Sequence, residues 1–285
     1  MKINFFFRNK NCYTSRRFIE EALSLSIDFS VYDPMMVSLI NDRLFYEGTE
    51  LENCDLAFFR GSVEALPREH IISIASFYEL EGTKTVNSSS SIAICANKWI
   101  TRNKLKKAGI PVPKGCLIFS SNEFEKAIDY LGGFPIVFKF FYGCSGMGVV
   151  YVPDRFTLES LYDAYKVSGF SFFFEDYLPA AMNGVRRFIV SGGELIADFV
   201  MAPSENDFRS NFAKGGQGGF CLKKDCFSEI AIKSVAACNL TTGSVDMVVD
   251  NESAVVLEVN SSPGIEMAEA TLKSNLASAI LKCLK

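Results

Sequence analysis

The sequence contains a single histidine, His70, among 285 residues. A serine or cysteine nucleophile activated by imidazole would depend on that one side chain, and so would a histidine zinc site. His70 falls within residues 63–80, which we expect to be helical, and a lone histidine there is more often structural. The composition therefore disfavours imidazole chemistry and leaves charge stabilisation by a metal ion and by lysine or arginine.

An excess of positive charge and long apolar runs are also missing. The formal net charge is -4, and the 29 lysines and arginines are scattered along the chain. This distribution indicates neither a nucleic-acid footprint nor a polybasic membrane anchor. No apolar run approaches the roughly 18 residues of a membrane span, and residues 1–8 are too short for a signal sequence. We expect a cytoplasmic protein without a nucleic-acid or membrane partner.

Paired cysteine motifs are absent as well. The nine cysteines are an odd number at irregular spacing, and no Cys-x-x-Cys occurs, so reduced thiols are expected. With 48% apolar residues, the chain can bury a large core and is long enough for two or three subdomains.

The most informative segment that is present spans residues 243–265. Two apolar, β-branched runs flank a polar reversal at 250–253, which predicts two adjacent strands. Glu258 and Asn260 are two residues apart and leave one face, and Asp246 can lie across from them. Two carboxylates and an amide are hard oxygen ligands suited to Mg²⁺. A solvated hairpin with a polar outer face is the alternative.

The first 90 residues alternate between strand and helix patterns, which favours a parallel sheet. We expect strands at 3–8, 29–32 and 55–60, and helices at 15–25 and 64–81. Ligands approach the carboxyl ends of such strands, so Arg8 and Arg60 are expected at the mouth of a cleft. Surface decoration is the alternative for both. No Gly-x-Gly-x-x-Gly follows the first strand, so a dinucleotide site is not supported.

A polar stretch at 85–91 marks the first boundary, and a second α/β unit follows it. We expect helices at 97–108 and 122–131, and strands at 117–119, 135–140 and 148–152. A glycine-rich loop at 143–148 lies between the last two strands, and Lys139 precedes it. Such a loop can bring backbone N–H groups close to a phosphate, although a plain tight turn is the alternative.

Antiparallel structure is expected in the remainder of the chain. The pattern predicts a helix at 158–166, a strand at 171–176, a hairpin at 186–200, and helices at 228–238 and 272–284. The predicted organisation is an α/β N-terminal domain (1–90), a central lobe (91–175) and a C-terminal lobe (176–285), the two lobes being α+β.

Four segments together carry a resemblance to a known family. They are Leu-Glu-Val-Asn-Ser-Ser-Pro-Gly at 257–264, Asp-Phe-Arg-Ser-Asn at 207–211, Val-Phe-Lys at 137–139 with its glycine loop, and Val86-Asn87 before Asn97-Lys98. Over nearly its full length the chain resembles the ATP-grasp superfamily and, within it, the RimK-like carboxylate-amine ligases, which include ribosomal-protein glutamate ligases and amino-group-carrier ligases. The resemblance implies an ATP-grasp fold that binds ATP between two lobes, with the N-terminal domain completing the substrate cleft.

The resemblance also implies roles for particular residues. The implied contacts of the ATP phosphates and ribose are Lys98, Lys139, Ser145, Gly146, Arg186 and Ser210, and those of the adenine are Glu175, Asp176 and Tyr177. The implied Mg²⁺ ligands are Asp246, Glu258 and Asn260. The implied catalytic residues are Arg209 and Asn211, and the implied substrate contacts are Arg8, Arg60, Arg209, Ser262 and Gly264.

The implied reaction joins an amino acid to the carboxylate of a small molecule, peptide or protein tail. The carboxylate attacks ATP to give an acyl phosphate and ADP, and an amine then displaces the phosphate; Mg²⁺ is the metal, with Mn²⁺ as a substitute. Arg209 suits this chemistry because its planar fork can hold phosphate or carboxylate in two places. A homo-oligomer is also implied.

Two departures from the family pattern concern the substrate. Gly184 stands where relatives commonly have aspartate, and Asn183 could replace that contact. Val200 and Met201 stand where relatives have basic residues, which removes charge that would hold glutamate as the incoming amine. A non-catalytic nucleotide-binding protein of the same fold is the main alternative, and a kinase-like or carboxylase activity is a further one.

Overall fold

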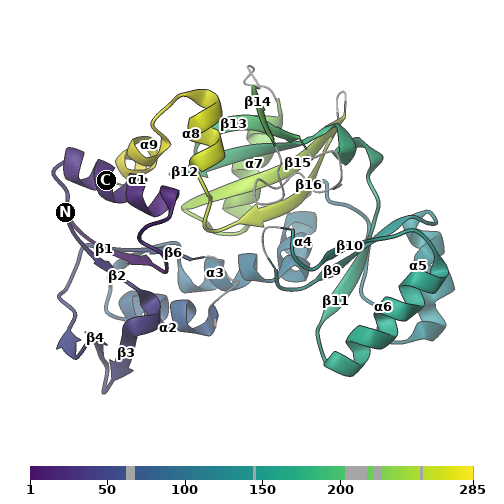
Figure 1. Ribbon diagram of the computed structural model, residues 1–285, viewed down its shortest axis with the longest axis horizontal. Helices are drawn as coiled ribbons and strands as arrows, with labels where there is room; N and C mark the ends of the chain where they lie inside the picture. Colours follow the sequence, from purple (N-terminus) through teal and green to yellow (C-terminus); the bar gives the residue numbers. More distant parts are fainter. Residues whose placement is uncertain (62–67, 144–145, 203–216, 221–225, 251–252, 285) are drawn as a thin grey trace.

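The computed structural model describes residues 1–61, 68–143, 146–202, 217–220, 226–250 and 253–284. Figure 1 shows three groups of elements, with the N-terminal sheet at one end and the lobe that contains α5 (Phe124–Leu131) and α6 (Arg155–Ser168) at the other. The long sheet that contains β12 (Val185–Ser191) and β15 (Thr242–Asp250) lies above and between them. The main sheets fall within 2–86, 115–176 and 185–260. The domain boundaries at 90 and 175 stay a prediction, and the second of them falls inside strand β11.

The N-terminal sheet is parallel, as its alternating pattern predicts, in the order β2-β1-β6-β7. Phenylalanines of β1 and β6 contact one another in its core, where the rings of Phe5 and Phe58 meet edge to face and are buried in one cluster with Phe18 of α1. The elements are β1 (Lys2–Phe7), α1 (Tyr13–Ser24), β2 (Asp28–Tyr32), β6 (Leu56–Arg60), α2 (Arg68–Leu80) and β7 (Lys84–Val86).

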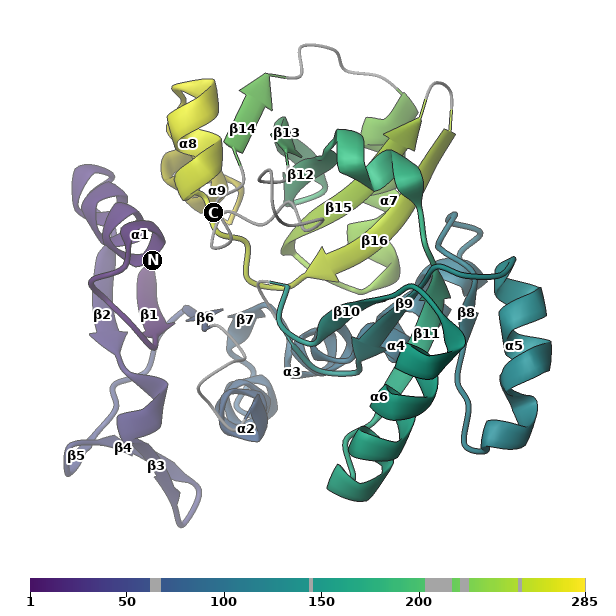
Figure 2. The same ribbon diagram turned by 45° about the vertical axis from the view of Figure 1, so that its right-hand side comes forward.

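A small antiparallel sheet between β2 and β6 is absent from the sequence-based prediction. A 3-10 turn, η1 (Pro34–Met36), leads into β3 (Val37–Ile40), β4 (Arg43–Tyr46) and β5 (Thr49–Glu50). The reversals at Asn41-Asp42 and Glu47-Gly48 have positive φ angles. Asparagine, aspartate and glycine adopt such angles readily, so their presence in the sequence is a turn signal. Figure 2 shows this sheet projecting away from the rest of the chain.

The central lobe begins with α3 (Ser89–Ala96) and α4 (Lys98–Lys107) and continues in an antiparallel sheet of order β10-β9-β11-β8. Helices α5 and α6 cover one side of this sheet through a buried aromatic core. The remaining elements are β8 (Gly115–Cys116), η2 (Ser121–Glu123), α5 (Phe124–Leu131), β9 (Ile136–Phe140), β10 (Val149–Val152), α6 (Arg155–Ser168) and β11 (Phe172–Asp176).

The strand expected at 117–119 is wrong. The pairing with β11 occurs instead at Gly115 and Cys116, opposite Glu175 and Phe174, and Phe119 is 82% exposed. The apolar residues at 117–119 suggested a strand, but the chain leaves the sheet after Cys116.

The C-terminal lobe is built on a sheet of order β14-β13-β12-β15-β16. Helix α7 contacts one face of this sheet, and α8 and α9 contact the other through the core shared with the N-terminal domain. The elements are η3 (Pro179–Asn183), β12 (Val185–Ser191), β13 (Glu194–Ala202), β14 (Gln217–Phe220), α7 (Cys226–Ala237), β15 (Thr242–Asp250), β16 (Ser253–Asn260), α8 (Glu266–Leu272) and α9 (Leu276–Cys283).

The single C-terminal helix expected at 272–284 is also wrong, because the segment contains the end of one helix and the whole of a second. Lys273 ends α8 in the left-handed conformation at a φ of 51°. Asn275 then caps α9, with its side chain accepting a hydrogen bond from the Ser278 N–H at 3.0 Å. Asn275 is a sequence signal for the start of a new helix, but the helical periodicity of the residues around it hides that signal.

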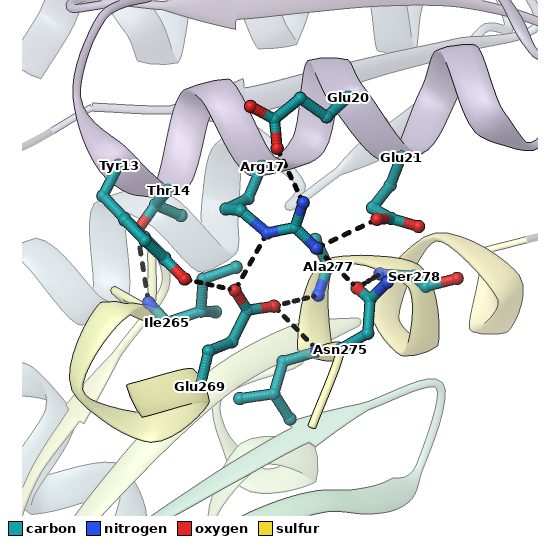
Figure 3. Close-up of polar contacts among 11 residues, drawn as sticks. Tyr13, Thr14, Arg17, Glu20, Glu21, Ile265, Glu269, Asn275, Ala277 and Ser278 are labelled. Carbon is teal, nitrogen blue, oxygen red and sulfur yellow. Dashed lines mark hydrogen bonds and ion pairs between the residues drawn. The ribbon is translucent and has the colours of Figure 1, made fainter. Parts of the chain in front are cut away.

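A polar cluster joins the N-terminal domain to the C-terminal lobe where α1 packs on α8 and α9 (Figure 3). Glu269 accepts hydrogen bonds from the Tyr13 hydroxyl at 2.8 Å and from Arg17 Nε at 3.0 Å. Its other oxygen accepts from the Leu276 N–H at 2.8 Å at the start of α9. Among the residues described above, no helix is long and apolar enough to cross a membrane.

Candidate functional site

Strands β15 and β16 bring two acidic side chains to the same point of the C-terminal sheet. Asp246 pairs directly with Glu258, as their spacing predicts, and Ser244 pairs with Asn260. The register shifts between Asp246 and Met247, and this irregularity lets both Leu257 and Glu258 line the cleft described below. Side chains of directly opposite residues lie about 5 Å apart at Cβ, so the two carboxylates face one another closely.

Each carboxylate has a cationic partner from another element. Arg187 of β12 donates to both oxygens of Asp246, at 2.6 and 2.7 Å. Lys98, the first residue of α4, donates to Glu258 Oε1 at 2.6 Å. Burial raises the pKa of Glu258, but Lys98, Lys139 and Arg187 outweigh this effect and lower its pKa overall. The glutamate is therefore held as a carboxylate, the form that ligates a metal.

The glycine-rich loop begins close to the same lysine. The Lys98 ammonium donates to the Gly143 carbonyl at 2.6 Å, and the Lys98 backbone N–H donates to the Phe141 carbonyl at 2.8 Å. Lys98 therefore connects the start of this loop with the acidic hairpin.

A second buried cluster lies at the end of β11. Glu175 is 3% exposed and is paired with Lys139 of the adjacent strand β9, and Arg102 Nε lies 3.7 Å from its Oε1. The neighbouring Asp176 has a raised pKa, because burial and the charge of Glu175 both disfavour its ionised form. Its backbone N–H donates to the Lys114 carbonyl at 3.1 Å.

These groups line one cleft of about 900 Å³, including its open mouth, between the central and C-terminal lobes. Its lining includes the charged side chains of Lys98, Lys139, Asp246 and Glu258. The walls are largely apolar and are formed by Pro113, Val137, Val149, Leu178, Ala181, Val185, Met201 and Leu257, with Glu175, Asp176 and Tyr177 at the strand end. This combination of apolar and charged lining residues suits a ligand with a flat apolar ring and an anionic tail.

The acidic hairpin also has the composition of a hard-cation site. Asp246, Glu258 and Asn260 lie on one face by register and supply carboxylate and amide oxygens. In the part of the chain that the structure describes, no three His, Cys, Asp or Glu side chains gather at one point. An amide is therefore needed to complete a three-ligand set.

Arg186 does not reach the cleft. It pairs with Asp198, with Arg186 Nε 2.7 Å from Oδ1, and its guanidinium lies 5.7 Å from the ring of Phe227 on α7. Successive strand residues point to opposite faces, so Arg187 rather than Arg186 shares the face of Asp246. The ATP contact expected of Arg186 stays a prediction, and the arginine that meets Asp246 is its neighbour Arg187.

Four expected site residues lie outside the described residues: Ser145, Arg209, Ser210 and Asn211. Gly146 is described and lines the cleft.

The expected substrate contacts of the N-terminal domain lie at the ends of their strands. Arg8 follows β1 and pairs with Asp33 at 2.8 Å near the surface. Arg60 ends β6 and lines a separate crevice together with Ser262. Gly264 is exposed beyond it.

Two further residues at these sites were not anticipated, and the role of a third was not specified. Arg187 and Arg102 hold buried carboxylates, and only the strand register and the fold show which carboxylate each meets. Asn87 accepts from the Thr241 and Thr242 N–H groups and donates to the carbonyls of Thr242 and Ser261. Its side chain thereby ties the start of β15 to the residue that follows β16, at the open end of the acidic hairpin.

Comparisons with known proteins agree with this geometry. The model of the RimK-like ATP-grasp domain matches residues 95–284. The chain is 29% identical to a probable alpha-L-glutamate ligase of Alkalilimnicola ehrlichii, over 100% of this chain and 95% of the relative. It is also 29% identical to a ribosomal protein bS6--L-glutamate ligase of Escherichia coli, over 100% and 96%.

Solved structures show the same fold at lower sequence identity. A RimK domain ATP-grasp protein of Sphaerobacter thermophilus superposes with a TM-score of 0.76 at 18% identity, covering 99% of both chains. The ATP-grasp ligase PsnB, in complex with a minimal precursor, Mg and ADP, gives 0.73 at 15% identity, covering 99% of this chain and 96% of that one. The two-lobed fold expected from the resemblance is thus confirmed, and the chain belongs to the RimK-like ATP-grasp family of ATP-dependent ligases.

Proposed function

We propose that this member of the family joins a carboxylate to an amine through an acyl phosphate and releases ADP and phosphate. The observation that carries the proposal is the cleft in which Lys98 and Lys139 meet the Asp246–Glu258 pair at the end of an apolar slot. Two lysines, together with two carboxylates that can ligate a metal ion, can balance the negative charge of a triphosphate. The apolar walls of the cleft suit a purine ring.

The nucleotide is proposed to lie along this cleft. Lys98 and Lys139 bind its phosphates, and the strand end at Glu175, Asp176 and Tyr177 offers backbone groups to the adenine. In the free protein both lysines are paired with glutamates, so phosphate binding exchanges one set of charge-assisted contacts for another.

Asp246, Glu258 and Asn260 are proposed to hold Mg²⁺, and Mn²⁺ to substitute for it. The bound ion would neutralise phosphate charge in the reaction. The residues themselves fit this role, because Glu258 is kept ionised and Asp246 is oriented by Arg187 through two hydrogen bonds.

The chemistry does not require a nucleophilic side chain. The substrate carboxylate attacks the γ-phosphate, and the amine then attacks the acyl carbon as phosphate leaves. Both steps develop negative charge on oxygen, and Lys98 and Lys139 are placed to stabilise it. Arg209 and Asn211, which lie outside the described residues, are proposed to contact the acyl phosphate.

The substrates are proposed to be an amino acid and a carboxylate on a small molecule, peptide or protein tail. Two relatives are glutamate ligases by name. Met201, however, is 2% exposed and lines the cleft, so this position offers an acidic amine no cation. Uncharged amino acids are therefore tested beside glutamate.

The test is a product analysis of the purified chain with ATP, Mg²⁺ and a panel of amino acids and peptides with free carboxyl termini. The proposal expects ADP and phosphate in amounts that match the new amide bond, and no turnover by an Asp246→Asn variant. Release of AMP and pyrophosphate with a productive pair would refute the acyl-phosphate route. Nucleotide binding without turnover of any pair would favour a non-catalytic role.

A further inference from the structure

Among the residues that the structure describes, no carboxylate pairs with Arg60 of the N-terminal domain. Arg60 ends β6, and within the same residues its buried Nε nitrogen has no hydrogen-bond partner. Within the described ranges its guanidinium donates only to Cys12 Sγ at 3.3 Å and Ser15 Oγ at 3.5 Å. The thiol is a weak acceptor, and the contact with the hydroxyl is long. Both contacts come from the same nitrogen, so the described residues leave most of the hydrogen-bonding capacity of Arg60 unused.

The guanidinium lies in a crevice between the N-terminal domain and the C-terminal lobe. One wall is made by Phe58 and Arg60 of the N-terminal sheet, and the other by Ser261, Ser262 and Pro263. Those three residues directly follow Asn260, the last of the expected metal ligands. The crevice therefore lies beside the end of the acidic hairpin.

The first turn of α1 adds to the positive potential of this crevice. Cys12 is the N-cap of the helix, and its side chain makes no capping hydrogen bond. The positive end of the helix dipole thus points toward the same region as Arg60. Burial raises the pKa of the Cys12 thiol, but hydrogen bonding to Ser15 and the charge of Arg60 lower it overall.

A partly buried cation without a counter-charge among the described residues destabilises the free protein, since desolvation is not offset by an ion pair. Two features of the crevice suit it to an anionic ligand: its mostly apolar walls and its position next to Ser262. Arginine binds carboxylates through a planar, two-pronged donor set, which is the geometry that an unused guanidinium offers. The phosphates already have Lys98 and Lys139, which line the separate cleft between the central and C-terminal lobes.

We propose that Arg60, with the first turn of α1, binds a carboxylate group of the substrate in the crevice beside Ser262. This inference rests on the proposed function, which supplies two sources of that group. One is the carboxylate that becomes the acyl phosphate, and the other is the α-carboxylate of the amino acid that acts as the amine.

The two walls of the crevice are held in register by the cluster of Figure 3. Thr14 Oγ1 accepts from the Ile265 N–H at 3.2 Å, directly after the Ser262 segment. Glu269 binds Tyr13 and Arg17 of the same helix. Glu269 is therefore a positioning residue for the site, because it fixes α1 against the loop that follows the metal hairpin.

The binding test compares each panel amino acid and peptide with its carboxyl amide, using calorimetry in the presence of Mg²⁺ and a non-hydrolysable ATP analogue. The wild type is expected to prefer at least one acid over its amide. In Arg60→Met that acid loses affinity by on the order of 10- to 100-fold while its amide is unaffected, as for a hydrogen bond to a charged group. Arg43→Met is the matched control, because Arg43 is an exposed arginine of the same domain.

Thermal unfolding separates this role from a purely structural one. Arg60→Met is expected to melt at the wild-type temperature or above it, since the variant removes an uncompensated buried charge. A clear drop in melting temperature would assign Arg60 to the fold and overturn the proposal. Unchanged affinity of the variant for the acid, or a wild type that prefers no acid over its amide, would overturn it as well.

Hydroxylamine distinguishes the two sources, because it replaces the amine and traps the acyl phosphate as a hydroxamate. Loss of hydroxamate in Arg60→Met assigns Arg60 to the acyl-forming carboxylate. Intact hydroxamate formation with a raised KM for the amino acid assigns it to the α-carboxylate of the amine. If the wild type forms neither ADP nor hydroxamate, the proposed function fails, whereas the acid-against-amide comparison still decides the role of Arg60.

Discussion

Lys98 Nζ lies 2.6 Å from Glu258 Oε1, so the first residue of α4 meets the acidic hairpin of the C-terminal lobe. The same ammonium also binds the Gly143 carbonyl at the start of the glycine-rich loop. A lysine at a helix N-terminus is unfavourable to the helix dipole, and its contact with a carboxylate offsets that cost. Three segments that are distant in sequence thus meet at one cation.

Replacing Glu258 with glutamine should abolish most of the activity. The change removes one charged ligand of the proposed metal, and the loss of several kcal/mol of charge stabilisation predicts a turnover that is lower by roughly 100-fold or more. The measurement is ADP formation at saturating ATP, together with Mn²⁺ binding by electron paramagnetic resonance.

Glu229→Gln on the exposed surface of α7 is the control for this change. Its turnover and its Mn²⁺ affinity should equal those of the wild type. Wild-type Mn²⁺ affinity in Glu258→Gln would remove Glu258 from the ligand set.

The adjacent arginines of β12 should behave differently. Arg186→Met leaves Asp198 buried without its partner and should cost about 3–5 kcal/mol of stability. Arg187→Met leaves Asp246 without its partner, and Mg²⁺ can replace the missing charge. Thermal unfolding with and without Mg²⁺ should therefore show metal rescue for Arg187→Met alone. Equal rescue of both variants would contradict the assignment of the two side chains to opposite faces.

Arg186 and Arg187 also show which parts of the site can be predicted from the sequence and which cannot. The alternation of residues in β15 and β16 predicts that Asp246, Glu258 and Asn260 share a face, because side-chain direction has a fixed period within a strand. In β12, two neighbouring arginines satisfy the pattern equally well from the sequence. Which one faces the metal hairpin depends on the register between β12 and β15, which is a tertiary property.

Lys139→Met should weaken ATP binding. In the free protein this lysine is paired with Glu175, and in the complex it is expected to bind phosphate. Loss of a charge-assisted contact predicts a Kd for Mg-ATP that rises by on the order of 10- to 100-fold, measured by calorimetry. Lys126→Met, an exposed lysine of α5, is the control. The same Kd in both variants would exclude Lys139 from the phosphate site.

Acid should weaken the attachment of α1 to the C-terminal helices. Burial raises the pKa of Glu21, but hydrogen bonds with Asn275 and Arg17 outweigh it and lower the pKa from its usual 4.5. A lowered pKa in the folded protein means that the stabilisation is complete above about pH 4.5 and is lost as the pH falls below it.

Glu21→Gln should therefore melt below the wild type at pH 7, and the difference should shrink at pH values below 4.5. Each kcal/mol corresponds to roughly 2–4 °C for a chain of this size. Melting curves over this pH range provide the measurement. A difference that stays constant with pH would show that Glu21 contributes by packing and not by its charge.

The misplaced elements share a physical cause. The segment after residue 265 has helical periodicity, but the left-handed Lys273 and the cap at Asn275 divide it into two helices. Phe119 reads as a strand residue and is exposed. In both places the apolar pattern indicates a local preference for helix or strand. The observed structure is decided by a turn and a cap in the first case and by strand pairing in the second.

Oxygen-isotope transfer from the acceptor to phosphate tests whether the reaction passes through an acyl phosphate. An acceptor labelled with ¹⁸O in its carboxylate is incubated with ATP, Mg²⁺, the amine and the purified chain, and the phosphate is analysed by mass spectrometry. Each released phosphate should carry one oxygen from the labelled carboxylate, because that oxygen bonds to phosphorus before the amine displaces it. Amide product accompanied by unlabelled phosphate would rule out the acyl phosphate.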